Sequence, residues 1–398
     1  MQSKSPMLFI EIDKTKFNFV VGKNLENNDF KIIHKFSTPV QGIIDNKIID
    51  FNLIFEIFSK NIFLIEQKIN HVFEEVVIVI NNFDCSLINF SGFKKLNGSQ
   101  LVKENVTYII NALKSKISEI ESDKVILQIF NSNFFLDGKK TENLPIGLFG
   151  NFYSHELSFF LINKNDFQNL SNILNKCNLK IKKIISKNFI EGVCLINNNT
   201  NLDSFFSIKI EENNSQITFF ENSALRYVQN FNFGSEIVFS DISKITGIKK
   251  STIKKMLPEL NFNQKYDDEV IEKKFFEVNH YRKIKKKLIF EVVKARISEM
   301  TELIALKNIN ITSFMKKKYP IFLSISDELS SKTFNKIYEN CFSQNKNLKV
   351  NFLNNLNREQ IFTEVNKIVQ YGWKKEAVPI IQEKKSIISR LFDIIFRS

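Results

Sequence analysis

The sequence predicts a mixed α/β protein, and three observations support this fold class. The chain has 398 residues, enough for two to four domains at roughly 150 residues each. Hydrophobic residues make up 43% and charged residues 25%, a balance that is typical of globular proteins and argues against disorder of the whole chain. Short β-rich runs alternate with stretches whose apolar residues recur at helical spacing, and this alternation indicates α/β architecture.

The first half of the chain begins with two β-rich runs joined by a short connection, a pattern typical of a hairpin. Farther on, the apolar residues from Leu101 to Ile120 recur at helical spacing, which predicts an amphipathic helix. The predicted elements of this half are, in chain order, strands over 8–11 and 17–21, a helix over 50–70, a strand over 76–80, a helix over 99–121, and strands over 124–130 and 155–162.

The second half continues the alternation and then becomes mainly helical. The predicted elements are a helix over 165–176, a strand over 180–185, alternating strands over 204–230, mostly helices over 241–304, a strand over 321–325 and a helix over 330–342. The same mixed pattern therefore extends over nearly the whole chain.

The chain is basic, with a formal net charge of +13 from 56 Lys and Arg against 43 Asp and Glu. Only six of the basic residues are arginines, the residue type preferred for bidentate recognition of phosphates and bases. A lysine excess spread along the chain is thus weak support for nucleic acid, and we predict no nucleic-acid partner. The simpler interpretation is a solvated surface shaped by codon bias, with an anionic membrane as a further contribution.

Cysteines and histidines form no pattern that indicates a metal site or a nucleophile. The cysteines are far apart and without a Cys-x-x-Cys pair, so we expect reduced thiols in the core: Cys85, Cys177, Cys194 and Cys341. The histidines are isolated from one another, so we expect them to be structural: His34, His71, His155 and His280. The sequence therefore predicts no catalytic residue and no metal.

Targeting signals are weak in the chain. The first apolar run covers only four residues before acids appear, too short for a signal peptide. No stretch approaches the roughly 18 apolar residues that a membrane-spanning helix needs. We therefore expect a chain on the cytoplasmic side of the membrane.

Residues 384–398 have the composition of an amphipathic helix that lies on a membrane surface. The apolar residues Ile387, Ile388, Leu391, Phe392 and Ile395 share one stripe, with Phe396 at its margin, and the basic residues Arg390 and Arg397 accompany them. The alternative is a terminal helix that packs on the body of the protein, since core helices share the same period.

The energetics of this tail favour weak and reversible attachment. Five large apolar side chains contribute about 1.5–3 kcal/mol each when fully buried, and basic residues near anionic lipid add about 1 kcal/mol each. Ordering the segment opposes this by about 1–2 kcal/mol per residue. One copy would dissociate readily, whereas several copies in a polymer would bind with high avidity, so the tail suits a protein that assembles.

Four stretches together resemble one known family. The most specific is 137–150, DGKKTENLPIGLFG, with an aspartate-glycine pair followed by a proline and two spaced glycines: Asp137, Gly138, Pro145, Gly147 and Gly150. The others are QGIIDNKIIDF over 41–51, NSALRYVQNFNFGSEIVFSDI over 222–242 and VVKARISEMTELI over 292–304. In these stretches the chain resembles FtsA, the family of bacterial actin-like proteins of the division septum.

The resemblance implies an actin-like (ribonuclease-H-like) fold of two lobes, with an inserted strand-helix-strand-strand (SHS2) module and a C-terminal amphipathic helix. The implied divisions are lobe 1 over 1–85, 163–190 and 360–375, the inserted module over 86–162, lobe 2 over 191–240 and 306–359, its helical subdomain over 241–305, a linker over 376–383 and the membrane helix over 384–398.

The resemblance also implies the partners and the location of the protein. Arg296 and Glu299 match the arginine and glutamate of a family helix that contacts the tubulin-like protein FtsZ. Residues at i and i+3 share a helix face, so the alternative is an ordinary ion pair within the helix. The other implied partners are further copies of the chain, anionic lipid and other division proteins. The implied location is the cytoplasmic face of the inner membrane at the division site, as a peripheral protein.

Where the resemblance implies ATP-binding loops, the residues depart from the family. Glu11, Asp13 and Lys14 stand in the first phosphate loop, where a carboxylate replaces backbone that should approach phosphate. The second phosphate loop and the helix start after its hairpin supply Lys209, Glu211, Glu212, Asn213 and Gly234. Because adjacent strand residues face opposite ways, we interpret Glu211 and Glu212 as a solvated turn and not as a catalytic pair.

The adenosine segment supplies only Ser324 and Ser326, and no glycine occurs from 248 to 371. We therefore expect binding of ATP and Mg²⁺ to be weak or lost, and no enzyme activity. The sequence thus predicts a membrane anchor and assembly adaptor for the FtsZ ring. The alternative is an ATP-binding actin-fold ATPase or a pilus-assembly type of actin-like protein.

Overall fold

The computed structural model describes residues 5–25, 29–81, 83–260, 269–276, 282–325, 332–346, 348–353 and 357–377. The chain forms two compact units. The first unit comprises Met1–Val40, Phe63–Asn82 and Ile181–Tyr371, and the second comprises Gln41–Ile62, Phe83–Lys180 and the residues after Tyr371, as far as the structure describes them. The proposed membrane helix over 384–398 lies outside the described residues, as do Ser326 and His280.

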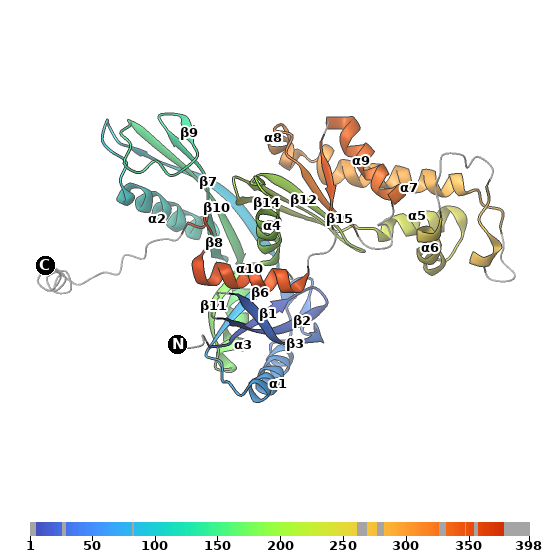
Figure 1. The fold of residues 1–398 in the computed structure, drawn as a ribbon, viewed down its shortest axis with the longest axis horizontal. Coiled ribbons are helices and arrows are strands. Elements are labelled where there is room, and N and C mark those ends of the chain that lie inside the picture. The colour runs from blue at the N-terminus through green and yellow to red at the C-terminus, as the bar shows by residue number, and fades with distance from the viewer. Residues whose placement is uncertain are drawn as a thin grey trace, which may run out of the picture. The chain divides into compact units, whose positions relative to one another are not determined.

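The first unit contains a five-stranded sheet with the strand order β11-β6-β1-β2-β3 (Figure 1). The strands are β1 (Met7–Ile12), β2 (Lys16–Asn24), β3 (Phe30–Pro39), β6 (Glu75–Ile80) and β11 (Lys180–Ser186). β1 pairs antiparallel with β2 and parallel with β6, and β2 pairs antiparallel with β3. β1 and β6 are buried over almost their whole length, as expected for continuous apolar runs beside a parallel neighbour.

A second five-stranded sheet in the same unit repeats this arrangement, with the order β14-β13-β12-β15-β16. Its strands are β12 (Phe205–Ile210), β13 (Ser215–Glu221), β14 (Ala224–Phe231), β15 (Ile321–Ile325) and β16 (Val350–Phe352). The first three strands again form an antiparallel meander, and the last two are parallel to β12. Each sheet therefore begins with a hairpin whose turn follows its central strand.

Helices of the first unit cover both sheets. α4 (Lys187–Asn198) contacts α10 (Arg358–Tyr371). α7 (Lys286–Thr301) packs against both α5 (Glu236–Thr246) and α9 (Lys332–Lys346). The remaining helical segments are α6 (Lys250–Met256), α8 (Thr312–Met315), the π-helix Glu302–Leu306 and the 3-10 turns Leu257–Glu259, Lys273–Phe275 and Ile309–Ile311. α7 buries one face at helical spacing, formed by Ile289, Val293, Ile297 and Met300.

The second unit is built on an antiparallel sheet with the order β7-β10-β8-β9. Its strands are β7 (Cys85–Lys95), β8 (Lys124–Leu136), β9 (Lys139–Thr141) and β10 (Phe152–Asn163), and α2 (Lys103–Ile120) packs on one face. The apolar core between them includes Ile109, Ile117, Leu157, Phe159 and Leu161. The unit also contains α3 (Lys164–Lys176) and the small hairpin of β4 (Ile43–Ile44) and β5 (Lys47–Ile48). α1 (Phe51–Ile69) belongs to both units along the chain.

Residues after α10 pair with the edge of β8. Asn131 donates its backbone N–H to the Lys375 carbonyl at 2.7 Å, and Ala377 donates to the Ile129 carbonyl at 2.8 Å. Ala377 is 4% exposed and belongs to the core of the sheet. The packed body therefore extends to Ala377, one residue beyond the start of the linker that the sequence predicts.

Most predicted elements are confirmed, and the differences have local causes. The helix predicted over 99–121 begins only at Lys103, because Leu101 N–H donates to the Leu148 carbonyl and holds the preceding residues in a loop. The strand predicted over 124–130 continues to Leu136 along β10. β3, α4 and α10 were not predicted. No helix in the described part of the chain is long and apolar enough to cross a membrane.

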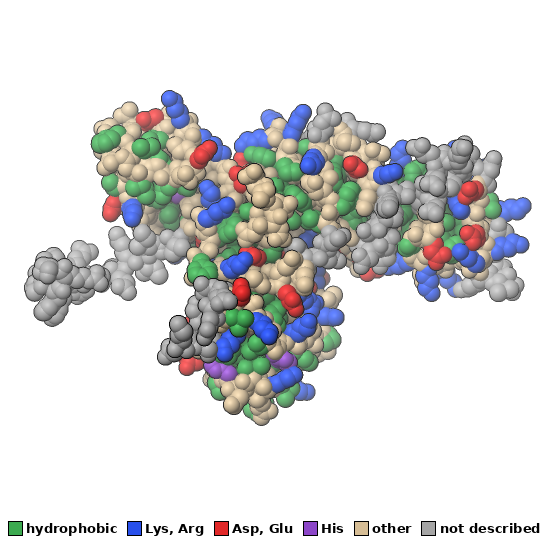
Figure 2. Space-filling model, in the orientation of Figure 1, with side chains coloured by type: hydrophobic (Ala, Val, Ile, Leu, Met, Phe, Trp, Pro, Cys, Tyr) green, Lys and Arg blue, Asp and Glu red, His purple; other side chains and the backbone are tan. Residues whose placement is uncertain are grey.

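Basic side chains are scattered over the face shown in Figure 2, among hydrophobic and neutral polar groups. Among the described residues on this face, they do not merge into one continuous patch. This distribution agrees with the interpretation of the net charge as a solvated surface.

Candidate functional site

The two hairpin turns meet in the first unit. The first turn joins β1 to β2 through residues 13–15, and the second turn joins β12 to β13 through residues 211–214. Lys14 connects them, since its Nζ donates to Glu211 Oε2 at 2.8 Å and to Asn214 Oδ1 at 2.5 Å. The sequence placed a phosphate loop at each of these turns, so the structure brings the two predicted loops together.

Lys187, the first residue of α4, is paired with both acids at the end of β1. Its Nζ lies 2.7 Å from Glu11 Oε1 and 3.2 Å from Asp13 Oδ2. Glu11 is 2% exposed and Lys187 only 15% exposed, so this is a buried ion pair. Burial alone would lower the pKa of Lys187, but the charges of Glu11, Asp13 and Glu191 prevail and raise it above its usual range.

Two amides complete the surroundings of these carboxylates. Asn18 Nδ2 donates to Glu11 Oε2 at 2.8 Å, and Asn81 Nδ2 donates to Asp13 Oδ1 at 2.7 Å. Burial alone would raise the pKa of Asp13, but Lys187 and the hydrogen bond from Asn81 outweigh it and lower the pKa below its ordinary value. Asp13 is therefore held ionised by fixed partners.

The start of α5 is bonded to the second turn. Ser235 N–H donates to the Glu211 carbonyl at 2.9 Å, and Glu236 N–H donates to the Glu212 carbonyl at 2.8 Å. Gly234 permits this approach, because a Cβ there would stand 2.1 Å from the Glu211 carbonyl oxygen. Two N–H groups at a helix start, which in other proteins bind anions, are thus occupied by the backbone of the turn.

The acids of the second turn are neutralised by lysines. Glu211 and Glu212 lie in a turn, as the sequence predicts, and Glu212 is paired with Lys254 of α6. Lys254 also lies 3.0 Å from Glu236, which Lys250 contacts at 2.9 Å. Burial alone would raise the pKa of Glu236, but these two lysines lower it.

Other residues assigned to the nucleotide loops lie in strands or at the surface. Lys209 is not in the second turn but within β12, where its Nζ pairs with Glu191 of α4. Ser324 lies within β15, opposite Lys209 in the strand register. Asn213 is exposed at the tip of the second turn. Contact of Ser324 and Ser326 with an adenosine stays a prediction.

These residues do not fit a nucleoside triphosphate with its metal ion. Such a ligand requires backbone N–H groups that are open to phosphate and carboxylates that are open to the metal. Here the carboxylates of Glu11 and Asp13 hold Lys187, the carboxylate of Glu211 holds Lys14, and the first N–H groups of α5 bind turn carbonyls. Within the described ranges, no group of three or more His, Cys, Asp or Glu is placed to hold a metal ion.

Arg296 and Glu299 share one face of α7, as predicted. Arg296 Nη1 lies 2.6 Å from Glu299 Oε2, so the ion pair within the helix is present. Arg296 Nε also donates to Asp241 Oδ2 of α5 at 2.5 Å, a contact that the sequence did not predict. Glu299 is 53% exposed, so its carboxylate is accessible on this face. Contact of the pair with FtsZ stays a prediction.

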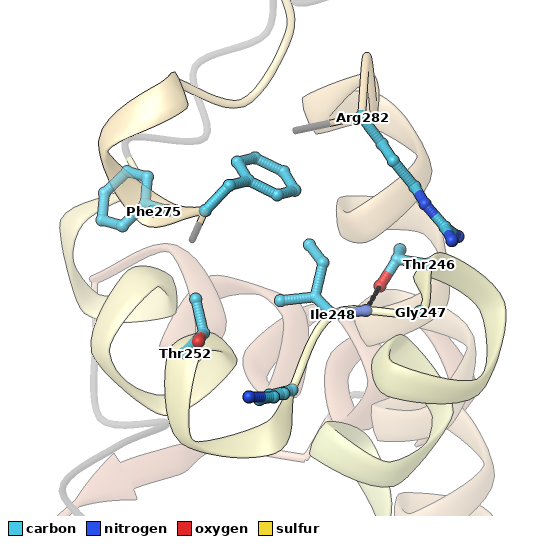
Figure 3. A pocket seen from close by; sticks show the side chains of 8 residues that line it. Thr246, Gly247, Ile248, Thr252, Phe275 and Arg282 are labelled. Atoms are coloured by element: carbon cyan, nitrogen blue, oxygen red, sulfur yellow. Dashed lines mark hydrogen bonds between the residues drawn. The ribbon is translucent and has the colours of Figure 1, made fainter. Parts of the chain in front are cut away.

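A pocket of about 300 Å³ lies at the end of α5 and the start of α6 (Figure 3). Its lining combines cationic, hydroxyl and apolar side chains from two separate stretches: Thr246, Gly247, Ile248, Lys249, Thr252, Phe275, Phe276 and Arg282. The Ile248 N–H donates to Thr246 Oγ1 at 3.3 Å in its floor. The sequence did not indicate this pocket, because its two sides are far apart in the chain.

His155 is fully buried in β10, between the rings of Phe134 and Tyr153 at centroid distances of 4.9 and 6.0 Å. Burial lowers its pKa to about 4, so the imidazole is neutral at pH 7. The four cysteines are free thiols, but only Cys194 is buried and the other three are partly exposed, so the expected core position is confirmed for Cys194 alone. His155 thus lies in a packed core, which agrees with the structural role that the sequence predicts.

Comparison with known proteins identifies the fold of the chain and not its family. No protein-family model matches it, and no curated protein matches it. A chain of the solved PilM–PilN type IV pilus biogenesis complex is similar, with a TM-score of 0.54 at 10% sequence identity over 92% of this chain and 98% of that chain. MreB5 of Spiroplasma citri bound to ADP matches over 92% of this chain and 96% of that chain, with a TM-score of 0.46 at 9% identity.

The PilM likeness and the repeated strand order of the two sheets show that the chain has an actin-like fold. The predicted α/β, actin-like fold class is therefore confirmed. Membership of the FtsA family, the SHS2 identity of the inserted sheet and the membrane helix stay predictions.

Proposed function

We propose that this protein is a membrane-tethered assembly adaptor of the cell division machinery, an actin-like protomer that works without nucleotide turnover. The observation that carries the proposal is that Lys14 and Lys187 pair with the acids at the two turns where an actin-like protein would hold its nucleotide. A protomer whose turns are joined by its own side chains needs no ATP to keep them together. Structural work, and not catalysis, is the role that such an arrangement supports.

The amphipathic tail over 384–398 supplies the membrane contact in this proposal. Deleting these residues is expected to release the protein from anionic lipid vesicles, measured by co-sedimentation. The double variant Ile388→Glu/Ile395→Glu tests the apolar stripe without shortening the chain and is expected to behave like the deletion. Unchanged sedimentation of either variant with vesicles would contradict the membrane role.

The exposed face of α7 supplies the partner contact. We infer that Glu299 and Arg296 contact FtsZ, with other division proteins and further copies of the chain as additional partners. Glu299→Lys is expected to weaken co-sedimentation with FtsZ polymers, because it reverses an exposed charge on that face. Glu291→Lys, on an exposed position of the same helix, is the matched control. Equal binding by the two variants would argue against this surface.

The pilus-assembly alternative has one specific observation in its favour, the likeness to PilM. It shares the fold with the division role, so binding experiments must separate them. Sedimentation with vesicles and purified FtsZ, with and without Mg-ATP, distinguishes a tether, a polymer and a nucleotide-dependent ATPase in one design. A rise of the melting temperature with Mg-ATP would favour the ATPase alternative, because ligands that bind the native state stabilise it.

A further inference from the structure

We propose that Lys14 and Lys187 are resident counter-ions that take the place of the metal ion and nucleotide in this actin-like fold. Lys187 pairs with both acids at the end of β1, and Lys14 joins the first turn to the second. This inference extends the proposed function, which requires only that the protein act without nucleotide turnover.

Lys187 has the surroundings of a bound cation. Its ammonium lies between the carboxylates of Glu11 and Asp13, at 2.7 and 3.2 Å, and an amide donates to the other oxygen of each carboxylate. Carboxylate oxygens are ligands that hard divalent cations prefer, and the two amides hold these carboxylates in place. A divalent ion added to this cluster would have to displace an ammonium that is buried and bonded to both acids.

Lys14 has two groups that could bind a phosphate, its ammonium and its backbone N–H. Its ammonium is bonded to the Glu211 carboxylate and the Asn214 amide oxygen, while its backbone N–H donates to Asp13 Oδ1 at 2.9 Å. A phosphate that drew Lys14 away would meet the unpaired carboxylate of Glu211 and the nearby Asp13. Both groups of Lys14 that suit a phosphate are therefore already used within the protein.

The three contacts connect elements that are distant in the chain. Lys187 ties the end of β1 to α4, Lys14 ties the first turn to the second, and the backbone of Gly234–Glu236 ties the second turn to α5. Side chains and backbone thus supply every one of these connections without a ligand. The buried Lys187 contacts are expected to carry more of the stability than the more exposed Lys14 contact.

Thermal unfolding of the full-length protein tests this inference with three substitutions. Lys187→Met is expected to lower the melting temperature by about 5 °C or more, because it leaves two acids without their cation. Lys187→Arg keeps the charge and is expected to stay close to wild type. Lys182→Met is the matched control. Lys182 is an exposed lysine of β11, in the same sheet as Glu11, and its Nζ pairs with Glu75 Oε2 at 2.7 Å.

Cation replacement is the second readout. Lys187→Ala opens space beside Glu11 and Asp13, so millimolar Mn²⁺ is expected to raise the melting temperature of this variant and not that of wild type. Adding Glu11→Gln to Lys187→Ala is expected to abolish the Mn²⁺ effect. Absence of an Mn²⁺ effect in Lys187→Ala would contradict the assignment of this position as a cation site.

Two further results would overturn the inference. One is a clear rise of the wild-type melting temperature with Mg-ATP, which requires that the turns accept a nucleotide despite both lysines. The other is a Lys187→Met variant no less stable than Lys182→Met. Vesicle and FtsZ sedimentation of the same variants reports on the proposed function separately, so the failure of one idea can be told from the failure of the other.

Discussion

The two five-stranded sheets of the first unit share one strand order, yet they neutralise the acids near their central turns in different ways. In the first sheet Glu11 is 2% exposed and its cation, Lys187, is 15% exposed at the start of the adjoining helix. In the second sheet Glu211 is 46% exposed and its cation, Lys14, comes from the opposite turn. The comparison shows that sheets of the same topology can place an acid in the core, as in the first sheet, or at the surface, as in the second.

The physical consequence is a difference in what each turn depends on. A buried pair strongly destabilises the fold when one partner is removed, because the other charge stays in a poorly solvated site. An exposed pair contributes little, and salt screens it. In the second sheet the close backbone contact of Gly234 with the turn takes the place of a buried ion pair. We therefore expect charge substitutions to damage the first turn and packing substitutions to damage the second.

The largest effect is expected for Glu11→Gln. The amide removes the charge that Lys187 faces at 2.7 Å while nearly keeping the shape, so the free energy of unfolding should fall by about 3–5 kcal/mol. Hydrogen exchange of peptides from β1, followed by mass spectrometry, measures the loss where it occurs. Trp373, the single tryptophan of the chain, lies in the second unit. Its fluorescence therefore reports on the second unit and serves as an internal control. An unchanged exchange rate in β1 would remove the basis of the comparison.

A smaller effect is expected for Gly234→Ala. The new methyl group would stand 2.1 Å from the Glu211 carbonyl oxygen and 2.6 Å from that of Glu212, so the second turn and the start of α5 must separate. Such overpacking typically costs about 1–3 kcal/mol. Hydrogen exchange of the Ser235 and Glu236 amides should accelerate more than that of β1. Equal acceleration of exchange in β1 and at these two amides would contradict a local clash at the second turn.

Acid pH is expected to weaken the first turn through Asp13. Its pKa is lowered in the folded state, so its contribution to stability is present above its ordinary value of 3.8 and is lost as the pH falls through the lower folded value. Asp13→Asn should destabilise the protein by about 1–2 kcal/mol at pH 7 and by less near pH 3, which lies below the ordinary pKa of 3.8, so that part of the contribution of the charge is already lost. Urea unfolding followed by circular dichroism at the two pH values measures this difference. An equal effect at both would show that the Asp13 charge is unimportant.

The sequence predicts the strands and helices that carry a clear period, and it misses those that do not. β1 is a compact β-rich run and α1 has a regular apolar stripe, so both were predicted within one residue at each end, while β2 ends three residues later than predicted. α4 was missed because its apolar residues form one short, nearly continuous run over 189–196, which period alone does not assign to a helix or a strand. β3 was missed because it is mostly exposed and interrupted by lysines and a histidine.

The candidate site was predicted in part for a similar reason. The sequence alone shows where the chain departs from an ATP-binding pattern, because each position can be judged by itself. These positions are Glu11, Asp13, Lys14, Glu211 and Glu212. The pairing of these acids with lysines is not visible in the sequence. Lys187 contacts Glu11 across 176 positions of the chain, and Lys14 contacts Glu211 across 197 positions. Only the folded sheets bring these charges together.

The smallest effect is expected for Glu211→Gln, which makes it the sharpest control on the comparison. The carboxylate is 46% exposed, and Asn214 continues to accept a hydrogen bond from Lys14 after the substitution. The free energy of unfolding should fall by less than about 1 kcal/mol, and the loss should shrink as salt is added. Urea unfolding at low and high salt measures both, with Glu11→Gln alongside. If Glu211→Gln were as damaging as Glu11→Gln and equally insensitive to salt, the two turns would be equivalent in energy as well as in topology.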